Sequence, residues 1–533
     1  MRYSHLVGVF MVGIIALAGC GGGGGGEAET SNEIPTADAG IDKTVQVNQS
    51  VNILGSGNDT DGTIVSYQWK KGSTVLADTA SLDYTPTTTG IHTLTLTVTD
   101  NEGATDSDTM DVNATEEDAA TRIMPLVIIR IEFNDYEFKS SASEWSQKIF
   151  GANEGQLNHY YKEISYGKFQ FQPAIETDGD NDGIITVHLD ENHPDELETK
   201  IDRLKNAAIL ADENIDFARY DTDSNGKISS KELQIIFLAA GGELATSAHP
   251  GVWAHQWCMD TSINVEPPTL DGVKLMSCDY EGVYAAFGEK HFNALTGNDA
   301  TIGVIAHELG HAVFGLLDLY DTDESSAGIG NFGLMGAGSW GYKANDLYPG
   351  ATPVHMTGWS KAYSGFVVPT VVADAQELQI KAASSADYML YKIPTGRSGE
   401  YFLIENRANS GYDRGLYILE EPGDFKGGLS ILHIDDNLLN DCSTTNSCNE
   451  NESHKLVDVE EANNPGLDAN PKLDINAHRG DYLNLFFQAN NESFTPSTEP
   501  DSNRYDGTGS GVSITNISAP GDIMSVDLTT KTN

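Results

Sequence analysis

Basic residues are scarce in this sequence. Its 533 residues include 31 lysines and arginines against 79 aspartates and glutamates, a formal net charge of −48. Such a charge repels the phosphates of nucleic acids and of anionic lipid head groups, so we expect no nucleic-acid partner. The excess of carboxylates favours bound cations instead, calcium above all.

The apolar run at the N-terminus is short. Val7–Ala18 does not reach the length of a membrane-spanning helix. Arg2 before this run and Leu17–Cys20 after it predict a signal peptide over residues 1–19. The cleavage site resembles a bacterial lipobox, which implies a lipid on Cys20; an ordinary secretory signal with an incidental cysteine is the alternative.

The glycine-rich residues 20–33 predict a flexible tether after the lipid. We therefore expect an exported lipoprotein at the cell surface, held to the membrane through its N-terminal lipid only. Clipping near a later linker would release it to the medium.

Cysteines are few, five in all. If Cys20 carries lipid, an even number remains for disulfides. The spacing of these predicts two local pairs in an oxidising compartment, Cys258–Cys278 and Cys442–Cys448.

Residues 34–113 have the pattern of a small β-sandwich, with short alternating runs between Gly, Asn, Asp and Thr turns. Four segments together resemble a polycystic-kidney-disease (PKD) repeat: Pro35–Gly40, Gly55–Gly62, Tyr67–Trp69 and Leu94–Asp100. The resemblance implies a spacer or binding accessory rather than a site of chemistry. Residues 114–121 predict an acidic linker.

Two further domains are predicted after this linker. Residues 122–370 open with an apolar strand at 124–133 and carry the motifs described below. From 371 to 533, short strand-like runs and Gly, Asn and Asp turns recur, which predicts a β-rich domain, a sandwich packed on the preceding one.

The segment 302–314 carries the most informative motif. Its apolar residues recur at helical spacing, with Asp299 as the expected N-cap. On such a helix His307 and His311 lie on one face, so that both imidazoles can bind one zinc ion. Glu308 lies beside the metal without being needed as a ligand, and it can take a proton from the attacking water.

A catalytic zinc needs a third protein ligand and one open position. Gly315 is suited to end the helix and turn the chain back, which makes Asp318 the expected third ligand. Asp321, or Glu324 in a thermolysin-like arrangement, remains an alternative. The glycine-rich segment around Met335 resembles the Met-turn beneath the zinc of metzincins.

Together these motifs resemble the immune inhibitor A family of bacterial secreted metallopeptidases. The shared pattern is His-Glu-x-x-His, a glycine, Asp-Leu-Tyr-Asp at 318–321 and Leu-Met-x-x-Gly-Ser-Trp at 334–340. Gly315 and Asp318 each lie one residue farther from His311 than in the family's usual spacing. The resemblance covers most of residues 122–529. It implies a metzincin-like zincin in which His307, His311 and Asp318 bind zinc and Glu308 is the base.

Residues 221–232 match the calcium loop of an EF-hand. Gly226 takes the sharp turn, and the expected ligands are Asp221, Asp223, Asn225, the carbonyl of Lys227, Ser229 (directly or through water) and Glu232. Because residues 233–239 suit a strand as well as a helix, we predict the loop and not the full helical pair. The calcium is expected to be structural.

The expected fold class is therefore multidomain: a PKD-like β-sandwich, an α+β metzincin-like zincin and a C-terminal β-rich sandwich. The expected function is a zinc-dependent endopeptidase that hydrolyses peptide bonds of extracellular proteins with a metal-activated water. One alternative is a catalytically inactive surface adhesin or binding lipoprotein, which the complete set of His307, Glu308 and His311 disfavours. Another is a metalloenzyme acting on glycan or ester bonds, which the family resemblance disfavours.

Overall fold

The computed structural model describes residues 32–47, 50–115, 121–263, 265–419, 425–462, 473–474 and 479–530. By its contacts the chain divides into two compact units, Met1–Ala119 and Ala120–Asn533. The predicted signal peptide, Cys20 and residues 116–120 of the predicted linker lie outside the described residues. Among the helices in the described ranges, none combines the length and the hydropathy needed to cross a membrane.

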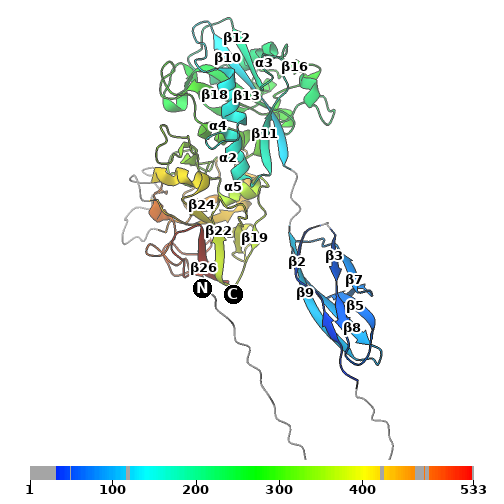
Figure 1. Cartoon of the computed structure of the whole chain (residues 1–533). Helices are drawn as coiled ribbons and strands as arrows, with labels where there is room; N and C mark the ends of the chain where they lie inside the picture. The colour runs from blue at the N-terminus through cyan, green and yellow to red at the C-terminus, as the bar shows by residue number, and fades with distance from the viewer. Residues whose placement is uncertain are drawn as a thin grey trace, which may run out of the picture. The chain divides into compact units, whose positions relative to one another are not determined.

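The first unit is built of strands alone in its described part (Figure 1). Its strands are β1 (Thr36–Asp38), β2 (Lys43–Gln46), β3 (Val51–Leu54), β4 (Ser56–Asn58), β5 (Ile64–Lys71), β6 (Thr74–Ala77), β7 (Ser81–Tyr84), β8 (Gly90–Asp100) and β9 (Thr105–Thr115). One sheet has the order β2-β9-β8-β5-β6, and β3 pairs with β7. Alternate residues of β8, such as Leu94 and Leu96, are buried against Trp69, as expected for a sandwich strand.

The second unit opens on a largely parallel sheet with the order β11-β10-β13-β18-β15. Its strands are β10 (Arg122–Phe133), β11 (Phe169–Pro173), β12 (Ile184–Leu189), β13 (Gln234–Glu243), β14 (Gly251–Val252), β15 (His255–Trp257) and β18 (Tyr284–Lys290). β15 is the antiparallel edge strand. The apolar run at 124–133 thus forms a strand, as predicted, and residues 234–243 are a strand rather than a second EF-hand helix.

Helices cover both faces of this sheet, which explains the continuous apolar run of β10. Leu126 and Ile128 face one core, with α1 (Ala142–Phe150), α2 (Leu157–Ile164) and α4 (Ile302–Phe314). Val127 and Ile129 face the other core, which α3 (Ile201–Ala211) covers.

The helix predicted at 302–314 is α4, but its N-cap is Thr301 and not Asp299. Asp299 pairs instead with Lys290 at the end of β18. The Thr301 hydroxyl donates to the Pro349 carbonyl at 3.0 Å. The side chains of Asp299 and Thr301 are thus both bound to residues outside the helix instead of capping it. Gly315 ends α4 in the left-handed conformation, with φ +65°, as predicted.

Strands dominate the chain after residue 370: β19 (Thr370–Val371), β20 (Ala375–Lys381), β21 (Tyr391–Pro394), β22 (Glu400–Ala408), β23 (Gly427–Asp435), β24 (Val457–Val459), β25 (Val512–Thr515) and β26 (Ile523–Thr530). They form the sheets β19-β21-β22-β23-β24 and β20-β26-β25. Phe402 and Ile431 face a core between these sheets, whereas Leu403 and Leu432 join the core around α4. A domain boundary at residue 370 stays a prediction.

Candidate metal centre

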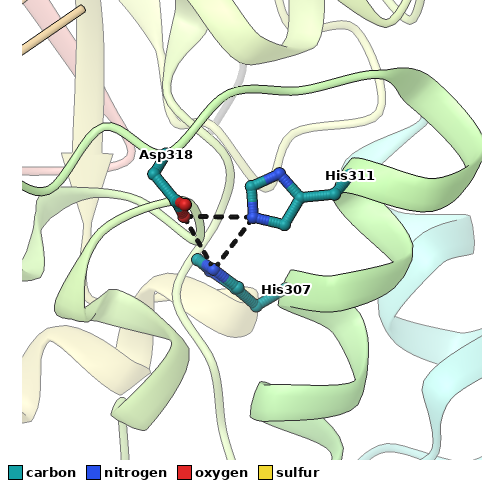
Figure 2. Close-up of side chains that lie close together, drawn as sticks. All are labelled: His307, His311 and Asp318. Atoms are coloured by element: carbon teal, nitrogen blue, oxygen red, sulfur yellow. Dashed lines mark hydrogen bonds and ion pairs between the residues drawn. The ribbon is translucent and has the colours of Figure 1, made fainter. Parts of the chain in front are cut away.

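Three side chains converge at one point beside α4 (Figure 2). The Asp318 Oδ1 lies 3.0 Å from the Nε2 atoms of both His307 and His311, and these nitrogens lie 3.2 Å apart. In a tetrahedral zinc site with bonds of about 2.0–2.1 Å, neighbouring donor atoms lie about 3.3 Å apart. The donor types and their spacing therefore fit one zinc ion.

Backbone carbonyls fix the orientation of both imidazoles. The Nδ1 of His307 donates to the Leu334 carbonyl at 2.9 Å, and the Nδ1 of His311 donates to the Leu316 carbonyl at 2.5 Å. A carbonyl only accepts, so in the neutral, metal-binding form the hydrogen of each ring lies on Nδ1 and the lone pair on Nε2. This tautomer turns both Nε2 lone pairs toward the common point.

The charges of the three groups reinforce one another. Without a metal, burial opposes protonation of His307, but the hydrogen bond to Asp318 and its charge outweigh this and raise the pKa of His307 to about 9. Zinc binding to Nε2 therefore displaces a proton from this ring. Burial would raise the pKa of Asp318, yet the adjacent imidazoles hold it well below its usual range. Asp318 is therefore an ionised carboxylate, the form that binds a metal.

The carboxylate of Asp321, one of the two alternatives, has other partners. Asp321 accepts hydrogen bonds from the Ser326 amide at 2.6 Å and the Ser325 hydroxyl at 2.9 Å, and it thereby closes its own turn. The metal-ligating cluster around the histidines includes Asp318 and neither Asp321 nor Glu324.

Met335 packs against the helix that carries the two histidines. It is 1% exposed, and a Cβ at Gly310 would lie 2.8 Å from its sulfur, so the helix and the glycine-rich turn pack closely. The Met335 carbonyl also accepts from the Leu319 amide at 2.8 Å. The turn thus supports both the helix and the segment that carries Asp318.

Glu308 is buried in α4 beside a second glutamate, Glu243, which the sequence motifs did not indicate. The Glu243 carboxyl accepts from the amides of Ala254 at 2.9 Å and Gly288 at 3.2 Å. Burial and, to a smaller extent, the charge of Glu308 raise the pKa of Glu243 to about 8. This raised pKa favours the neutral form of the Glu243 carboxyl when no metal is bound.

The predicted calcium loop forms a second carboxylate cluster. Oxygens of Asp221, Asp223 and Glu232 lie within 4.8 Å of one another. The Asp221 carboxylate accepts from the amides of Asn225 and Gly226, each at 2.9 Å, and Glu232 accepts from the Ser229 amide at 3.0 Å.

Two further predicted ligands of this loop form hydrogen bonds within it. The Asn225 amide group donates to Asp223 at 2.7 Å, and the Ser229 hydroxyl donates to Glu232 at 2.9 Å. The ligand atom predicted for Lys227 is its carbonyl, and its ammonium lies over the Tyr280 ring. The loop follows a 3-10 turn at Phe217–Tyr220 and precedes β13, so no helical pair flanks it.

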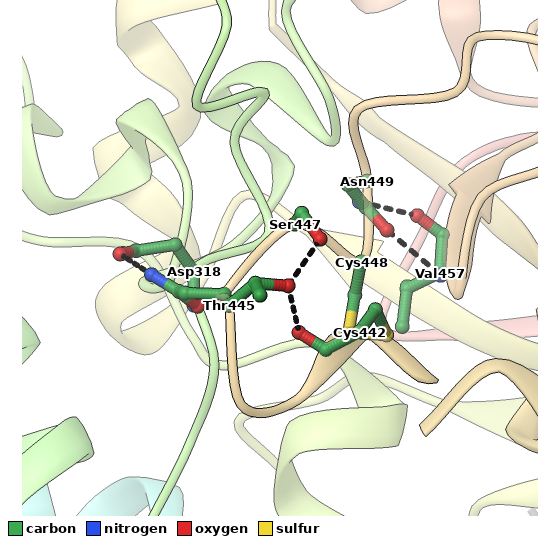
Figure 3. Close-up of a disulfide and its surroundings, with 8 residues drawn as sticks. Asp318, Cys442, Thr445, Ser447, Cys448, Asn449 and Val457 are labelled. Atoms are coloured by element: carbon green, nitrogen blue, oxygen red, sulfur yellow. Dashed lines mark hydrogen bonds between the residues drawn. A yellow bond between two sulfur atoms is a disulfide. The ribbon is translucent and has the colours of Figure 1, made fainter. Parts of the chain in front are cut away.

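Both predicted disulfides are present. Cys258 pairs with Cys278, and Cys442 pairs with Cys448. The second disulfide closes a short ring beside Asp318 (Figure 3). The predicted lipidation site, Cys20, lies outside the described residues.

A His-Glu-x-x-His helix with a nearby third ligand is the arrangement of zinc peptidases. Family comparison agrees: residues 133–367 match the immune inhibitor A peptidase M6 catalytic domain, and residues 39–114 match the K319L-like PKD domain. Residues 133–367 are thus similar to an immune inhibitor A-type catalytic domain, and residues 39–114 are similar to a PKD domain.

A curated relative is the pre-pro-metalloprotease PrtV of Vibrio cholerae serotype O1, 31% identical over 164 residues. The match spans 29% of this chain and only 16% of the relative. Among solved structures, the PKD1 domain of Vibrio anguillarum Epp is 27% identical. The match covers 16% of this chain and 100% of the Epp domain, with a TM-score of 0.15. The PKD1 domain of the Vibrio cholerae metalloprotease PrtV is 27% identical. That match covers 15% of this chain and 94% of the PKD1 domain, with a TM-score of 0.13.

Proposed function

We propose that this protein is a zinc-dependent endopeptidase that hydrolyses peptide bonds of extracellular proteins. The observation that carries the proposal is the convergence of donor atoms of His307, His311 and Asp318 within 3.0–3.2 Å of one another, beside the helix that holds both histidines and Glu308. The family match over residues 133–367 supports it, as does the name of the relative, a metalloprotease. The parallel sheet, α4 and the Met335 turn support a metzincin-like zincin fold.

Each residue has a distinct role in this proposal. His307, His311 and Asp318 hold the zinc, which when bound supplies a Lewis acid that activates water and polarises the peptide carbonyl. Glu308 takes a proton from the attacking water and passes it to the leaving amine. The carbonyls of Leu334 and Leu316 keep the two imidazoles in the ligating tautomer.

The test is casein hydrolysis by the wild type and Glu308→Ala, with the zinc content of both determined. The variant should keep about one zinc per chain, since Glu308 is not a ligand, and should lose activity by roughly 10²- to 10⁴-fold.

Glu324→Asn is the matched control, because it removes a nearby carboxylate at a left-handed position that asparagine tolerates (φ +63°). It should keep both zinc and activity, whereas Asp318→Asn should lose zinc. Full casein hydrolysis by Glu308→Ala would contradict the proposal, and absence of zinc from the wild type would favour a binding lipoprotein.

We infer further that residues 221–232 bind a structural calcium ion. Because binding to the folded state alone stabilises it, the thermal midpoint of the wild type should be higher with millimolar calcium than with a chelator. Glu232→Gln removes one ligand charge and should lose most of this calcium-dependent increase while keeping the midpoint measured in chelator. An equal increase in both proteins would place the calcium elsewhere.

We also infer that the protein is exported and anchored by a lipid on Cys20, on the basis of Leu17–Cys20. Cells that express the wild type should incorporate a fatty-acid label into this protein and keep it in the membrane fraction. Cys20→Ser should abolish the label, and labelling of that variant would contradict the inference.

A further inference from the structure

Asp318 is held by a residue 128 positions later in the chain, Asn446. The Asn446 Nδ2 donates to the Asp318 Oδ2 at 2.5 Å, and the Asn446 Oδ1 accepts from the Asp318 backbone amide at 3.0 Å. These two bonds fix the carboxylate relative to its own backbone. They occupy Oδ2 and leave Oδ1 facing the imidazoles of His307 and His311.

Asparagine suits this position for two reasons. Its backbone is left-handed, with φ +55°, a conformation that asparagine and glycine adopt more readily than other residues. Its amide also both donates and accepts, which matches a carboxylate oxygen and a backbone amide side by side. An aspartate of the same shape would accept only, and would place a second negative charge against Asp318.

Asn446 lies within the ring that the Cys442–Cys448 disulfide closes. Inside this ring the Thr445 hydroxyl contacts the Cys442 carbonyl at 3.1 Å and the Ser447 hydroxyl at 2.6 Å (Figure 3). Cys448 is 3% exposed. A short closed ring restricts the conformations of its residues, so the ring presents Asn446 in a narrow range of positions.

The residues after the ring attach it to the same segment of the catalytic region. The Asn449 Nδ2 donates to the Leu319 carbonyl at 2.9 Å, and Asn449 also bonds both backbone groups of Val457 in β24. Glu450 accepts from the Thr322 hydroxyl and Glu452 from the Ser325 hydroxyl. Residues 318–325 are therefore bound along their length to residues 446–452.

We propose that the Cys442–Cys448 ring positions the third zinc ligand, with Asn446 as the positioning residue that aims Oδ1 of Asp318 at the two histidines. This inference rests on the proposed zinc site. Partners that orient a metal ligand typically contribute about 10- to 100-fold to metal affinity. The ring thus makes the C-terminal region a part of the metal centre rather than an accessory to it.

The test measures zinc binding by the full chain in competition with a chromogenic chelator, together with the visible spectrum of the Co²⁺-substituted protein, which reports coordination geometry. Asn446→Gly keeps the left-handed backbone and removes both hydrogen bonds. It should weaken zinc binding by about 10- to 100-fold and shift the Co²⁺ bands. Asn446→Asp should weaken zinc binding at least as much, because it places a second carboxylate directly against that of Asp318 and the two negative charges repel each other.

Thr445→Ala is the matched control, since it loses two hydrogen bonds in the same ring without contact to Asp318. It should keep the zinc affinity and the Co²⁺ spectrum of the wild type even if its thermal midpoint falls. Opening the ring with Cys442→Ser and Cys448→Ser should weaken zinc binding in the same direction as Asn446→Gly. The two changes combined should be less than additive, because they act through one contact.

Wild-type zinc affinity and Co²⁺ bands in Asn446→Gly would overturn the positioning role. The outcome is separable from the proteolytic function: a wild type that binds zinc and does not hydrolyse casein would refute the peptidase and leave this test intact. A wild type without zinc affinity would refute both.

Discussion

At the scale of single residues, His433 gives the clearest pH dependence. It lies 3.1 Å from a Glu400 oxygen and 3.2 Å from a Glu460 oxygen, and its ring stacks on Tyr505. Burial would lower the pKa of His433, but the hydrogen bonds and charges of these carboxylates, with Asp458 nearby, raise it to about 9. A pKa above the unfolded value of about 6.5 means that the protonated ring stabilises the fold.

This stabilisation is fully present below about pH 6.5 and is lost as the pH rises through about 9. At pH 6 we expect the unfolding free energy of the wild type to be higher than that of His433→Gln. The difference between the two proteins should shrink by on the order of 2 kcal/mol by pH 9.5. Urea unfolding at a series of pH values measures it. A difference that does not change with pH would show that His433 contributes packing alone.

At the scale of elements, the packing of α4 on the glycine-rich turn sets which helix glycines can be replaced. A Cβ at Gly303 would lie 1.8 Å from the Ser339 carbonyl, which is backbone in the turn at Ala337–Trp340. A Cβ at Gly310 would lie 2.8 Å from the flexible end of Met335 and 3.6 Å from a methyl group of Leu316, which is an ordinary contact. Backbone cannot move aside as a methionine side chain can.

Gly303→Ala should therefore lower the unfolding free energy by about 1–3 kcal/mol, the usual cost of overpacking. Gly310→Ala, on the same helix, should be close to neutral because its gain in helix propensity of about 1 kcal/mol offsets the displaced side chain. Urea midpoints of the two variants compare them directly. Equal destabilisation of the two variants would contradict this prediction, because it would mean that the backbone of the turn moves aside as easily as the Met335 side chain.

At the scale of the whole molecule, the hydrophobic core of the region that matches the M6 catalytic domain includes side chains from the C-terminal strands. Leu309 of α4 belongs to one apolar core with Leu403 and Leu432 of the C-terminal strands. The buried Arg407 in β22 binds Asp413 at 2.6 Å and donates to the Phe332 carbonyl beside the Met335 turn. The catalytic region and the β-rich region therefore share their stability.

A chain that ends at residue 369 should consequently fail to unfold cooperatively and should bind a hydrophobic dye, since the residues of the C-terminal strands that cover this core would be missing. Calorimetry and dye fluorescence check this. Adding residues 370–533 as a separate chain should restore part of the transition. A truncated protein with the wild-type thermal midpoint would show that residues up to 369 fold alone.

The sequence by itself determined the features that depend on neighbours along the chain. These are the helix at 302–314, the histidines four residues apart on its face, the turn at Gly315, both disulfides and the loop at 221–232. Their spacing is set by helix pitch and by short loop closure, which sequence patterns record directly.

Only the tertiary structure decided the features that depend on distant segments. It brought Asp318, and neither Asp321 nor Glu324, to the two imidazoles, and it placed Asn446 against that carboxylate. It also buried Glu243 beside Glu308 and paired Asp299 with Lys290 instead of letting it cap α4. No local pattern encodes such contacts, because they arise when separate elements pack on one core and their polar groups must each find a partner there.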